Sequence, residues 1–284
     1  MVILKKVLKG LGIVCFVFLF LIGYFYITSL SLIVTKYEID SDFESPIRIV
    51  QITDLHNAEY GDSNSDLINI IKEQNPDLIM MTGDMLNEDD KNTDIVCDLI
   101  QKLSSIAPVY FGYGNHEKTW EKTFGVNLRD ILQESGAIVV DNDYIDLAIK
   151  GNDVRIGGYM GYYRTPHMIT QDENQQKIEM QFFADFENTD RYKILLNHIP
   201  TNWLDWGYIN IYPVNLVLSG HYHGGVVRLF DRGLFVPYVG WFPKYTKGMF
   251  KGDKAICILS TGLGTEHIIP RLNNPGEIVV IDLK

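Results

Sequence analysis

The longest apolar segment of the chain covers residues 11–34 and contains no charged side chain. A helix that rises 1.5 Å per residue would extend about 36 Å over this segment, which is enough to cross a hydrocarbon layer of about 30 Å. Three lysines precede the segment, so the positive-inside rule predicts a cytoplasmic N-terminus and a chain that continues outside the cytoplasm. A cleaved signal peptide is the alternative, although its apolar region is typically shorter and no Ala-x-Ala-like site follows here. The pattern favours residues 1–35 as a short cytoplasmic N-terminus and a single-pass anchor in the cell membrane.

Beyond a junction at residues 36–45, strand-like apolar runs alternate with segments that have the period of an amphipathic helix. The pattern predicts strands at 47–52, 78–82 and 108–112, and helices at about 64–74, 92–104 and 118–135. After residue 137 it predicts short strands at 137–140, 144–150, 154–158, 192–197, 215–219, 255–260 and 277–283, with one polar helix at about 172–187. Strand–helix units next to strand-rich segments favour one α/β domain at 46–284, in which two facing sheets have helices outside.

The charge of the predicted domain restricts its function. Residues 36–284 contain all 36 acidic residues and 22 of the 25 basic residues, a formal charge of −14. This balance argues against a nucleic-acid groove, which would have a basic surface. Cys97 and Cys257 lie in apolar patterns and predict buried thiols rather than a disulfide framework or a cysteine zinc site.

Three residues with oxygen-bearing side chains follow predicted strands at regular intervals. Asp54 and Asp84 are 30 residues apart, and Asn115 follows Asp84 after 31 residues, about the length of one strand–helix–strand unit. Because parallel strands end at the same edge of a sheet, each unit delivers its residue to the same place. An aspartate after a strand can also cap a helix, and an asparagine can serve in a turn, but the two similar intervals favour a shared site.

Four histidines extend this set: His56, His198, His221 and His223. The seven side chains supply two carboxylates, one amide oxygen and four imidazoles, which are enough ligands for two divalent metal ions. Nitrogen and oxygen ligands without a thiolate fit Mn, Fe, Zn or Co. Two such ions bring four positive charges and the aspartates return two negative ones, so the surplus suits a hydroxide and a phosphate group. Asp84 is the natural bridging ligand because a carboxylate has two oxygens.

These residues form five blocks that occur in the order of a known family: Asp54-Leu55-His56, Gly83-Asp84, Gly114-Asn115-His116-Glu117, His198 and Gly220-His221-Tyr222-His223. The joint pattern resembles the calcineurin-like metallophosphoesterases, and the similarity extends to Leu283. His-Gly-Gly at 223–225, Phe-Pro-Lys-Tyr at 242–245 and the Asn-Asn-Pro-Gly-Glu-Ile-Val-Val ending resemble the bacterial membrane-anchored branch. Glu117 stands where most relatives have aspartate, a substitution that is also common in the family.

The resemblance implies a four-layer α/β/β/α sandwich of two mixed β-sheets. It also implies two sets of metal ligands: Asp54, His56, Asp84 and His223 for one ion, and Asp84, Asn115, His198 and His221 for the other. By the same implication, His116 faces the phosphate and is a catalytic residue, since an imidazole can donate a proton near neutral pH. The alternative is that His116 only orients Asn115. His167 and His267 match no block, and we expect them to be ordinary surface or core residues.

We therefore expect a membrane-anchored two-metal phosphohydrolase with an N-terminal transmembrane helix. A metal-bridging hydroxide would attack phosphorus, and His116 would assist departure of the leaving oxygen. Analogy with the branch favours a phosphodiester or pyrophosphate substrate over a monoester, and the anchor suggests a lipid- or envelope-linked phosphate. The alternatives are a phosphomonoesterase on the same site, a metal-dependent hydrolase of C–N or C–O bonds, and a non-catalytic metal-binding scaffold.

Overall fold

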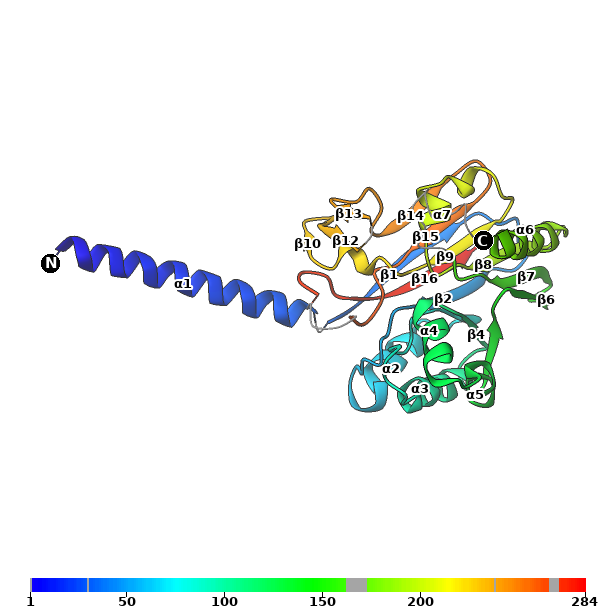
Figure 1. Cartoon of the computed structure of the whole chain (residues 1–284), viewed down its shortest axis with the longest axis horizontal. Coiled ribbons are helices and arrows are strands. Elements are labelled where there is room, and N and C mark those ends of the chain that lie inside the picture. Colours follow the sequence, from blue (N-terminus) through cyan, green and yellow to red (C-terminus); the bar gives the residue numbers. More distant parts are fainter. Residues whose placement is uncertain (1, 30, 162–172, 238, 266–270) are drawn as a thin grey trace.

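The computed structural model describes the whole chain except residues 1, 30, 162–172, 238 and 266–270 (Figure 1). A long N-terminal helix extends away from an α/β domain that contains two six-stranded sheets. The α-helices are α1 Val2–Ser29, α2 Ser65–Glu73, α3 Asp94–Ser104, α4 Asn115–Phe124, α5 Leu128–Glu134, α6 Glu173–Glu187 and α7 Thr201–Leu204. Three short 3-10 helices are η1 Asp62–Asn64, η2 Tyr208–Asn210 and η3 His223–Gly225.

The first sheet has the strand order β1-β16-β2-β3-β4-β5. Its strands are β1 Leu32–Ile39, β16 Gly276–Leu283, β2 Ile47–Ile52, β3 Leu78–Thr82, β4 Val109–Gly112 and β5 Ala137–Val140. All neighbours in this sheet are parallel except β16 and β2, which are antiparallel. The carboxyl ends of β2, β3 and β4 therefore meet at one edge, as the strand–helix spacing predicts.

The second sheet has the order β14-β15-β9-β8-β7-β6. Its strands are β14 Gly248–Lys251, β15 Ile256–Leu259, β9 Leu216–Ser219, β8 Tyr192–Leu196, β7 Asn152–Gly158 and β6 Asp143–Ile149. The four inner strands are parallel, and the two outer strands pair antiparallel with their neighbours. Two small hairpins lie outside both sheets and are formed by β10 Arg228–Leu229 with β11 Arg232–Gly233, and by β12 Phe235–Val236 with β13 Gly240–Trp241.

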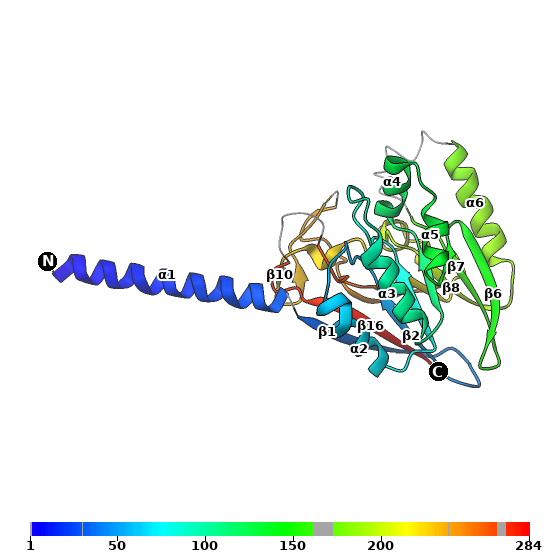
Figure 2. The same cartoon turned by 90° about the horizontal axis from the view of Figure 1, so that it is seen from below.

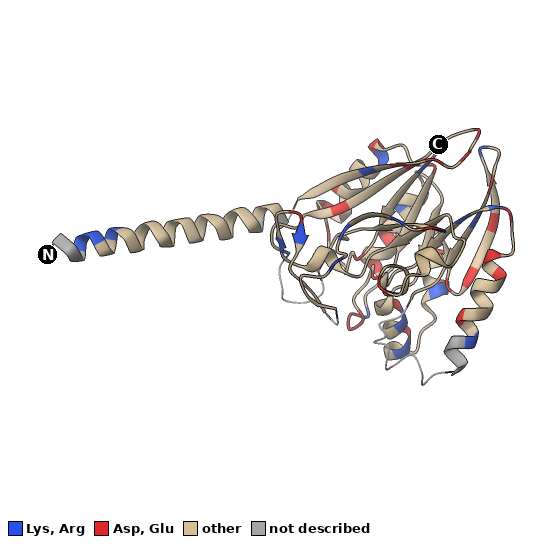
Figure 3. Ribbon diagram, turned by 90° about the horizontal axis from the view of Figure 1, so that it is seen from above, with Lys and Arg blue, Asp and Glu red and all other residues tan. Residues whose placement is uncertain are grey.

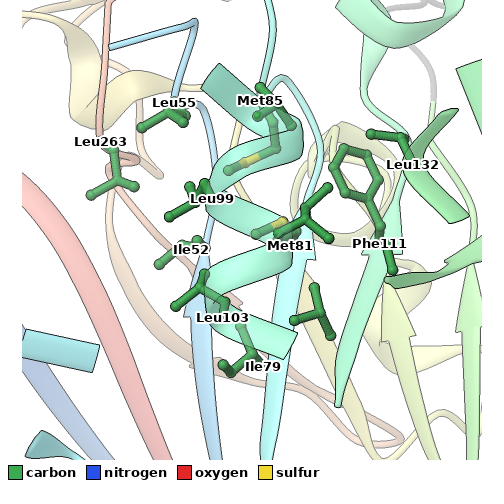
Figure 4. Packing of buried hydrophobic residues seen from close by; sticks show 14 of the residues in the cluster. Ile52, Leu55, Ile79, Met81, Met85, Leu99, Leu103, Phe111, Leu132 and Leu263 are labelled. Atoms are coloured by element: carbon green, nitrogen blue, oxygen red, sulfur yellow. The ribbon is translucent and has the colours of Figure 1, made fainter. Parts of the chain in front are cut away.

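Three apolar clusters show how the layers pack. Successive residues of β3 alternate between clusters: Ile79 and Met81 pack under α2, α3 and α5, whereas Leu78 and Met80 face the second sheet. Figure 4 shows the first cluster, with Leu99 of α3 beside Met81. The third cluster joins the outer face of the second sheet to α6 and α7. Both faces of the central strands are thus buried, which explains their continuous apolar runs and confirms the predicted four-layer α/β/β/α sandwich of two mixed sheets.

One predicted helix is in fact two. The sequence pattern at 118–135 predicts a continuous helix, but α4 ends at Phe124 and α5 begins at Leu128. Gly125 terminates α4 in the left-handed conformation, with φ of 64°, and its backbone N–H donates to the Glu121 carbonyl. A glycine adopts this conformation without steric cost, so it is a common helix terminator. The helix also begins earlier than predicted, at Asn115, with only Tyr113 and Gly114 between it and β4.

The boundary between the anchor and the domain also needs correction. The predicted anchor and junction together cover residues 1–45, but Leu32–Ile39 is strand β1, paired along its whole length with β16. Its apolar residues continue the apolar run of α1, so composition alone does not separate the two elements. Within α1, the segment Lys5–Phe25 is long and apolar enough to cross a membrane. By that measure it is equally suited to a membrane anchor or a signal sequence.

Candidate metal centre

The structure brings all seven predicted ligands and His116 to one edge of the two sheets. Asp54 and His56 follow β2, Asp84 follows β3, and Asn115 and His116 open α4, the helix that comes after β4. His198 follows β8, and His221 and His223 follow β9. Ring nitrogens and carboxylate oxygens from these loops lie within 4.8 Å of one another in three overlapping groups: Asp54, His56 and His223; His56, Asp84 and His116; and Asp84, His198 and His221.

In the first of these groups, three potential ligand atoms lie close together. His223 Nε2 lies 3.4 Å from Asp54 Oδ1 and 3.3 Å from His56 Nε2. Burial, together with the nearby His56, holds the pKa of His223 well below its ordinary value, so this ring is neutral at pH 7. A neutral imidazole offers a lone pair, which is the form that binds a metal ion.

The ring of His56 is held in one tautomer by Asn87. The Asn87 amide nitrogen donates to the His56 carbonyl at 3.0 Å. Asn87 Oδ1 therefore faces His56 Nδ1 and accepts a hydrogen bond from its N–H at 3.2 Å. With the proton of the neutral ring on Nδ1, the lone pair is on Nε2, the atom that faces His223. Partners of this kind orient histidine ligands in metal sites.

Beside Asp84 are two buried polar atoms that make no hydrogen bond among the described residues. His198 Nδ1 donates to the Thr82 carbonyl at 2.7 Å, so Nε2 faces the site and offers a lone pair once the charged ring gives up its second proton. Nε2 lies 2.9 Å from Asp84 Oδ2, but it makes no hydrogen bond among the described residues, and neither does the buried Oδ1 of Asn115. Unsatisfied buried polar atoms are costly and rare. Their convergence beside a carboxylate fits a divalent metal ion, which would satisfy all three side chains at once.

Burial and mutual repulsion set the protonation of the two aspartates. Burial is the main cause that raises the pKa of Asp54 to about 6, and the nearby charge of Asp84 adds to it. Burial would also raise the pKa of Asp84, but His198, and then His116 and His56, outweigh it and hold this pKa well below its ordinary value. Asp84 therefore keeps its charge even within the protein interior, as expected of a group that faces cations.

His116 presents a proton-bearing nitrogen at this edge. Its ring is 1% exposed, and Nδ1 accepts a hydrogen bond from the Glu88 backbone N–H at 3.1 Å. In the neutral ring the proton is therefore on Nε2. The backbone N–H of His116 donates to Asp84 Oδ1 at 2.8 Å, so the residue also fixes the orientation of that carboxylate. The ring packs edge-on against His56, with the ring centroids 4.6 Å apart.

Glu117 holds the loops that carry Asp84 and Asn115 together, a role that its sequence motif alone does not reveal. Its fully buried carboxylate accepts hydrogen bonds from the backbone N–H groups of Asp84 at 2.8 Å, Met85 at 2.9 Å and Gly114 at 2.8 Å. The bond to Gly114 also satisfies a free N–H at the start of α4, where glutamate at the third helical position is a known signal. Burial, with the Asp84 charge, raises the pKa of Glu117 despite these donors.

The glycines of the sequence blocks are required by close approach. A Cβ on Gly220 would lie 2.2 Å from Asp54 Oδ2, and a Cβ on Gly114 would lie 2.2 Å from Asp84 Oδ1. Five of the predicted ligands themselves adopt left-handed backbone conformations with positive φ: Asp54, His56, Asp84, His221 and His223. Such conformations store strain and gather at functional sites. The predicted non-ligands His167 and His267 lie outside the described residues.

Comparison with known proteins identifies the family. The calcineurin-like phosphoesterase family matches residues 47–225. The chain is 30% identical to the metallophosphoesterase YkuE of Bacillus subtilis over 255 residues, which cover 84% of this chain and 79% of YkuE. It is 27% identical to the metallophosphoesterase YkoQ of the same organism, with 82% of each chain covered. It is 24% identical to the phosphodiesterase YaeI of Escherichia coli, which covers 85% of this chain and 84% of YaeI. Because the matched region spans more than half of the chain and contains the entire cluster of carboxylates and histidines, this protein belongs to the calcineurin-like phosphoesterases and is a metal-dependent phosphoester hydrolase.

Proposed function

We propose that this protein is a two-metal phosphohydrolase that cleaves a phosphodiester or pyrophosphate bond in a lipid- or envelope-linked substrate. The single observation that supports it most is the gathering of ring nitrogens and carboxylate oxygens into three overlapping groups, two of which include Asp84. A binding scaffold would not need His116 held as a proton donor beside these groups. The phosphodiesterase YaeI, a relative over most of this chain, favours a diester over a monoester.

In this proposal the ligands divide into two sets. Asp54, His56, Asp84 and His223 hold one ion, and Asp84, Asn115, His198 and His221 hold the other, with Asp84 shared. When bound, the two ions, from among Mn, Fe, Zn and Co, lower the pKa of water at the site and neutralise the phosphate oxygens. The protein contributes the fixed positions of its side chains: Asn87 and the Thr82 carbonyl orient the rings of His56 and His198, and Glu117 holds the Asp84 loop.

His116 would protonate the leaving oxygen. Its Nδ1 is held by the Glu88 N–H, so the proton on Nε2 can be transferred, and its backbone hydrogen bond to Asp84 fixes the residue next to the phosphate site. A general acid of this kind contributes about 10²–10⁴-fold to the rate when the leaving group is poor. The contribution is small when the leaving group departs without a proton.

The experiment replaces His116 with asparagine and compares two substrates. His116→Asn should retain its metal ions and lose turnover strongly, by about 10²-fold or more, on an alkyl phosphodiester, but far less on a nitrophenyl phosphodiester. Metal content is measured on the same preparation. Equal losses on both substrates with intact metal content would assign His116 to phosphate positioning, and loss of metal would assign it to support of Asn115. A wild-type preference for monoesters would replace the diesterase proposal with the phosphomonoesterase alternative.

We also propose that α1 is an uncleaved anchor that holds the domain outside the cytoplasm. The segment Lys5–Phe25 has the length and composition of a membrane span, and its lysines lie at the N-terminal end. α1 ends at Ser29 and β1 begins at Leu32, and the Ser31 backbone N–H donates to the Thr28 carbonyl at 3.3 Å, so the connection between anchor and domain is short. The domain is therefore expected to remain close to the bilayer surface.

A further inference from the structure

Exposed apolar side chains are concentrated in one short segment of the domain. Outside α1, nine large apolar side chains of the described residues are exposed, and six of these lie between residues 229 and 242. We call these six residues the apolar lip: Leu229, Phe230, Phe235, Val239, Trp241 and Phe242. Phe230 is 94% exposed, Trp241 72% and Phe242 68%. Single exposed apolar residues need no explanation, but a cluster of this kind marks a surface that another partner covers.

The apolar lip is part of the two small hairpins, β10–β11 and β12–β13, at the end of the domain from which α1 extends (Figures 1 and 2). The hairpins are fixed there by the chain that precedes β16: the Arg228 backbone N–H donates to the Leu272 carbonyl at 3.0 Å. β16 in turn begins beside the start of β1, with Gly276 opposite Leu32. The lip and the base of α1 therefore share one edge of the structure.

Strand register places the metal centre at this same edge. Val34 of β1 pairs with Ile278 of β16, and β16 pairs with β2 so that Ile52 lies opposite Ile278 in the next register position. Asp54 follows Ile52 by two residues, and Leu32 opens β1 two residues before Val34, so both lie at the same edge of the sheet. Two strand spacings of about 4.8 Å separate β1 from β2, which puts Asp54 about 10 Å across the sheet from the base of α1.

The charge around the lip suits a membrane surface. Between residues 229 and 244 the charged side chains are Asp231, Arg232 and Lys244, all exposed, so basic residues outnumber acidic ones beside the lip. Figure 3 shows acidic residues along β6 and α6, at the opposite end of the domain from α1. The domain as a whole is acidic, so its orientation at an anionic bilayer favours the end with basic and aromatic residues. Tryptophan and other aromatic side chains are enriched at the interface between lipid and water.

We infer that the apolar lip is a second contact with the lipid bilayer, inserted at its interface beside α1, so that the metal-bearing edge faces the lipid head groups. This inference rests on the proposed anchoring by α1 and deepens it, because it specifies which face of the domain meets the membrane. It also specifies the substrate class, because a phosphate bond at the level of the lipid head groups would be accessible to the metal-bearing edge while the substrate stays in the membrane.

The test measures quenching of Trp241 by lipid. The full-length protein is reconstituted into vesicles of phosphatidylcholine and phosphatidylglycerol, with either ordinary or brominated acyl chains. Trp241 is one of four tryptophans, so its insertion should remove up to about a quarter of the tryptophan emission in brominated vesicles. Trp241→Tyr keeps an interfacial aromatic side chain and should abolish this loss.

A matched control uses Ile211, which is also exposed but follows η2 on the side where β9 and β15 begin, away from the metal-bearing edge. In the double variant Trp241→Tyr, Ile211→Trp, the new tryptophan should remain unquenched. Co-flotation with vesicles tests the anchor separately. Flotation without quenching of Trp241 overturns this inference and leaves the anchor intact. Coverage of the lip by a second copy of the chain would give that result. Failure to float overturns the anchor and the inference together.

Discussion

Metal binding by the purified protein should strengthen steeply between pH 7 and pH 9. The reason is His198, whose Nε2 lies 2.9 Å from Asp84 Oδ2. Burial alone would lower the pKa of this imidazole, but the attraction of the Asp84 carboxylate outweighs burial and raises the pKa to about 9. At pH 7 a metal ion must therefore displace a proton from His198 before Nε2 can become a ligand.

The magnitude follows from the distance between the pKa and the working pH. Removing the proton from His198 at pH 7, about two units below the pKa of this group, costs about 2.7 kcal/mol. Metal affinity should therefore rise about tenfold per pH unit from pH 7 to pH 9 and then level off. The metal-free protein should respond in the opposite sense. A folded-state pKa above the unfolded value of 6.5 stabilises the fold fully below pH 6.5, and this stabilisation of about 3 kcal/mol is lost as the pH rises through 9.

Two measurements check these opposite trends. Calorimetric titration with Mn²⁺, under exclusion of oxygen and in buffers of different ionisation enthalpy, gives the affinity and the number of protons released. We expect about one proton from His198 at pH 7 and a value that approaches zero above pH 9. Urea unfolding of the chelated protein over the same pH range should show a falling stability.

Two variants separate His198 from its neighbours. His198→Gln should lose the pH dependence of metal affinity between pH 7 and pH 9. His223→Gln should weaken binding but keep the pH dependence, because the pKa of His223 is held well below its ordinary value and the ring is already neutral at pH 7. An affinity that does not change from pH 7 to pH 9 in the wild type would show that His198 is neutral without metal, and the assignment of its proton would be wrong.

Three further predictions concern the shared ligand, its support and the orientation of the chain. Asp84→Ala should lower both metal content and turnover, and two ions still bound to this variant would refute its role as the shared ligand. Glu117→Ala leaves three buried N–H groups without an acceptor and should lower the free energy of unfolding by about 3 kcal/mol or more, and weaken metal binding as well. The control Glu121→Ala removes the acceptor of the Leu128 N–H and should lower stability alone. Urea unfolding and metal analysis of both variants check this. Protease added to intact cells or spheroplasts should degrade the domain and leave a short anchored stub, whereas protection until lysis would reverse the proposed orientation.

The sequence could predict those parts of the site that depend on the spacing of residues after parallel strands. Asp54, Asp84 and Asn115 each follow a strand in a parallel run, and parallel strands have their carboxyl ends at a common edge, so spacing along the chain translates into proximity. The strands themselves are recognisable because both faces are buried. The role of Glu117 could not be predicted in the same way, since it depends on three backbone N–H groups from two different loops.

Other features depend on contacts between distant segments, which the hydrophobic pattern does not record. The apolar residues of β1 merge with those of α1, and only their pairing with β16 shows that they form a strand. The break between α4 and α5 depends on a single glycine in the left-handed conformation. The residues Trp241 and Phe242 could belong to a core or to a surface by composition, and only the structure shows that both are exposed.

The position of β16 has a consequence for how the chain folds. This last strand lies between β1 and β2, so the strand that follows the anchor is joined to the sheet only by the final segment of the structure; Ser41 and Lys284, which share two hydrogen bonds, are 243 residues apart. Such distant pairing is slow, because a long loop must close before the contact forms. If the anchor remains in the membrane and the domain crosses it in chain order, β1 would stay unpaired at the membrane until β16 had crossed. Completion of the sheet, and with it the placement of the metal-bearing edge, would thus be the closing step of export.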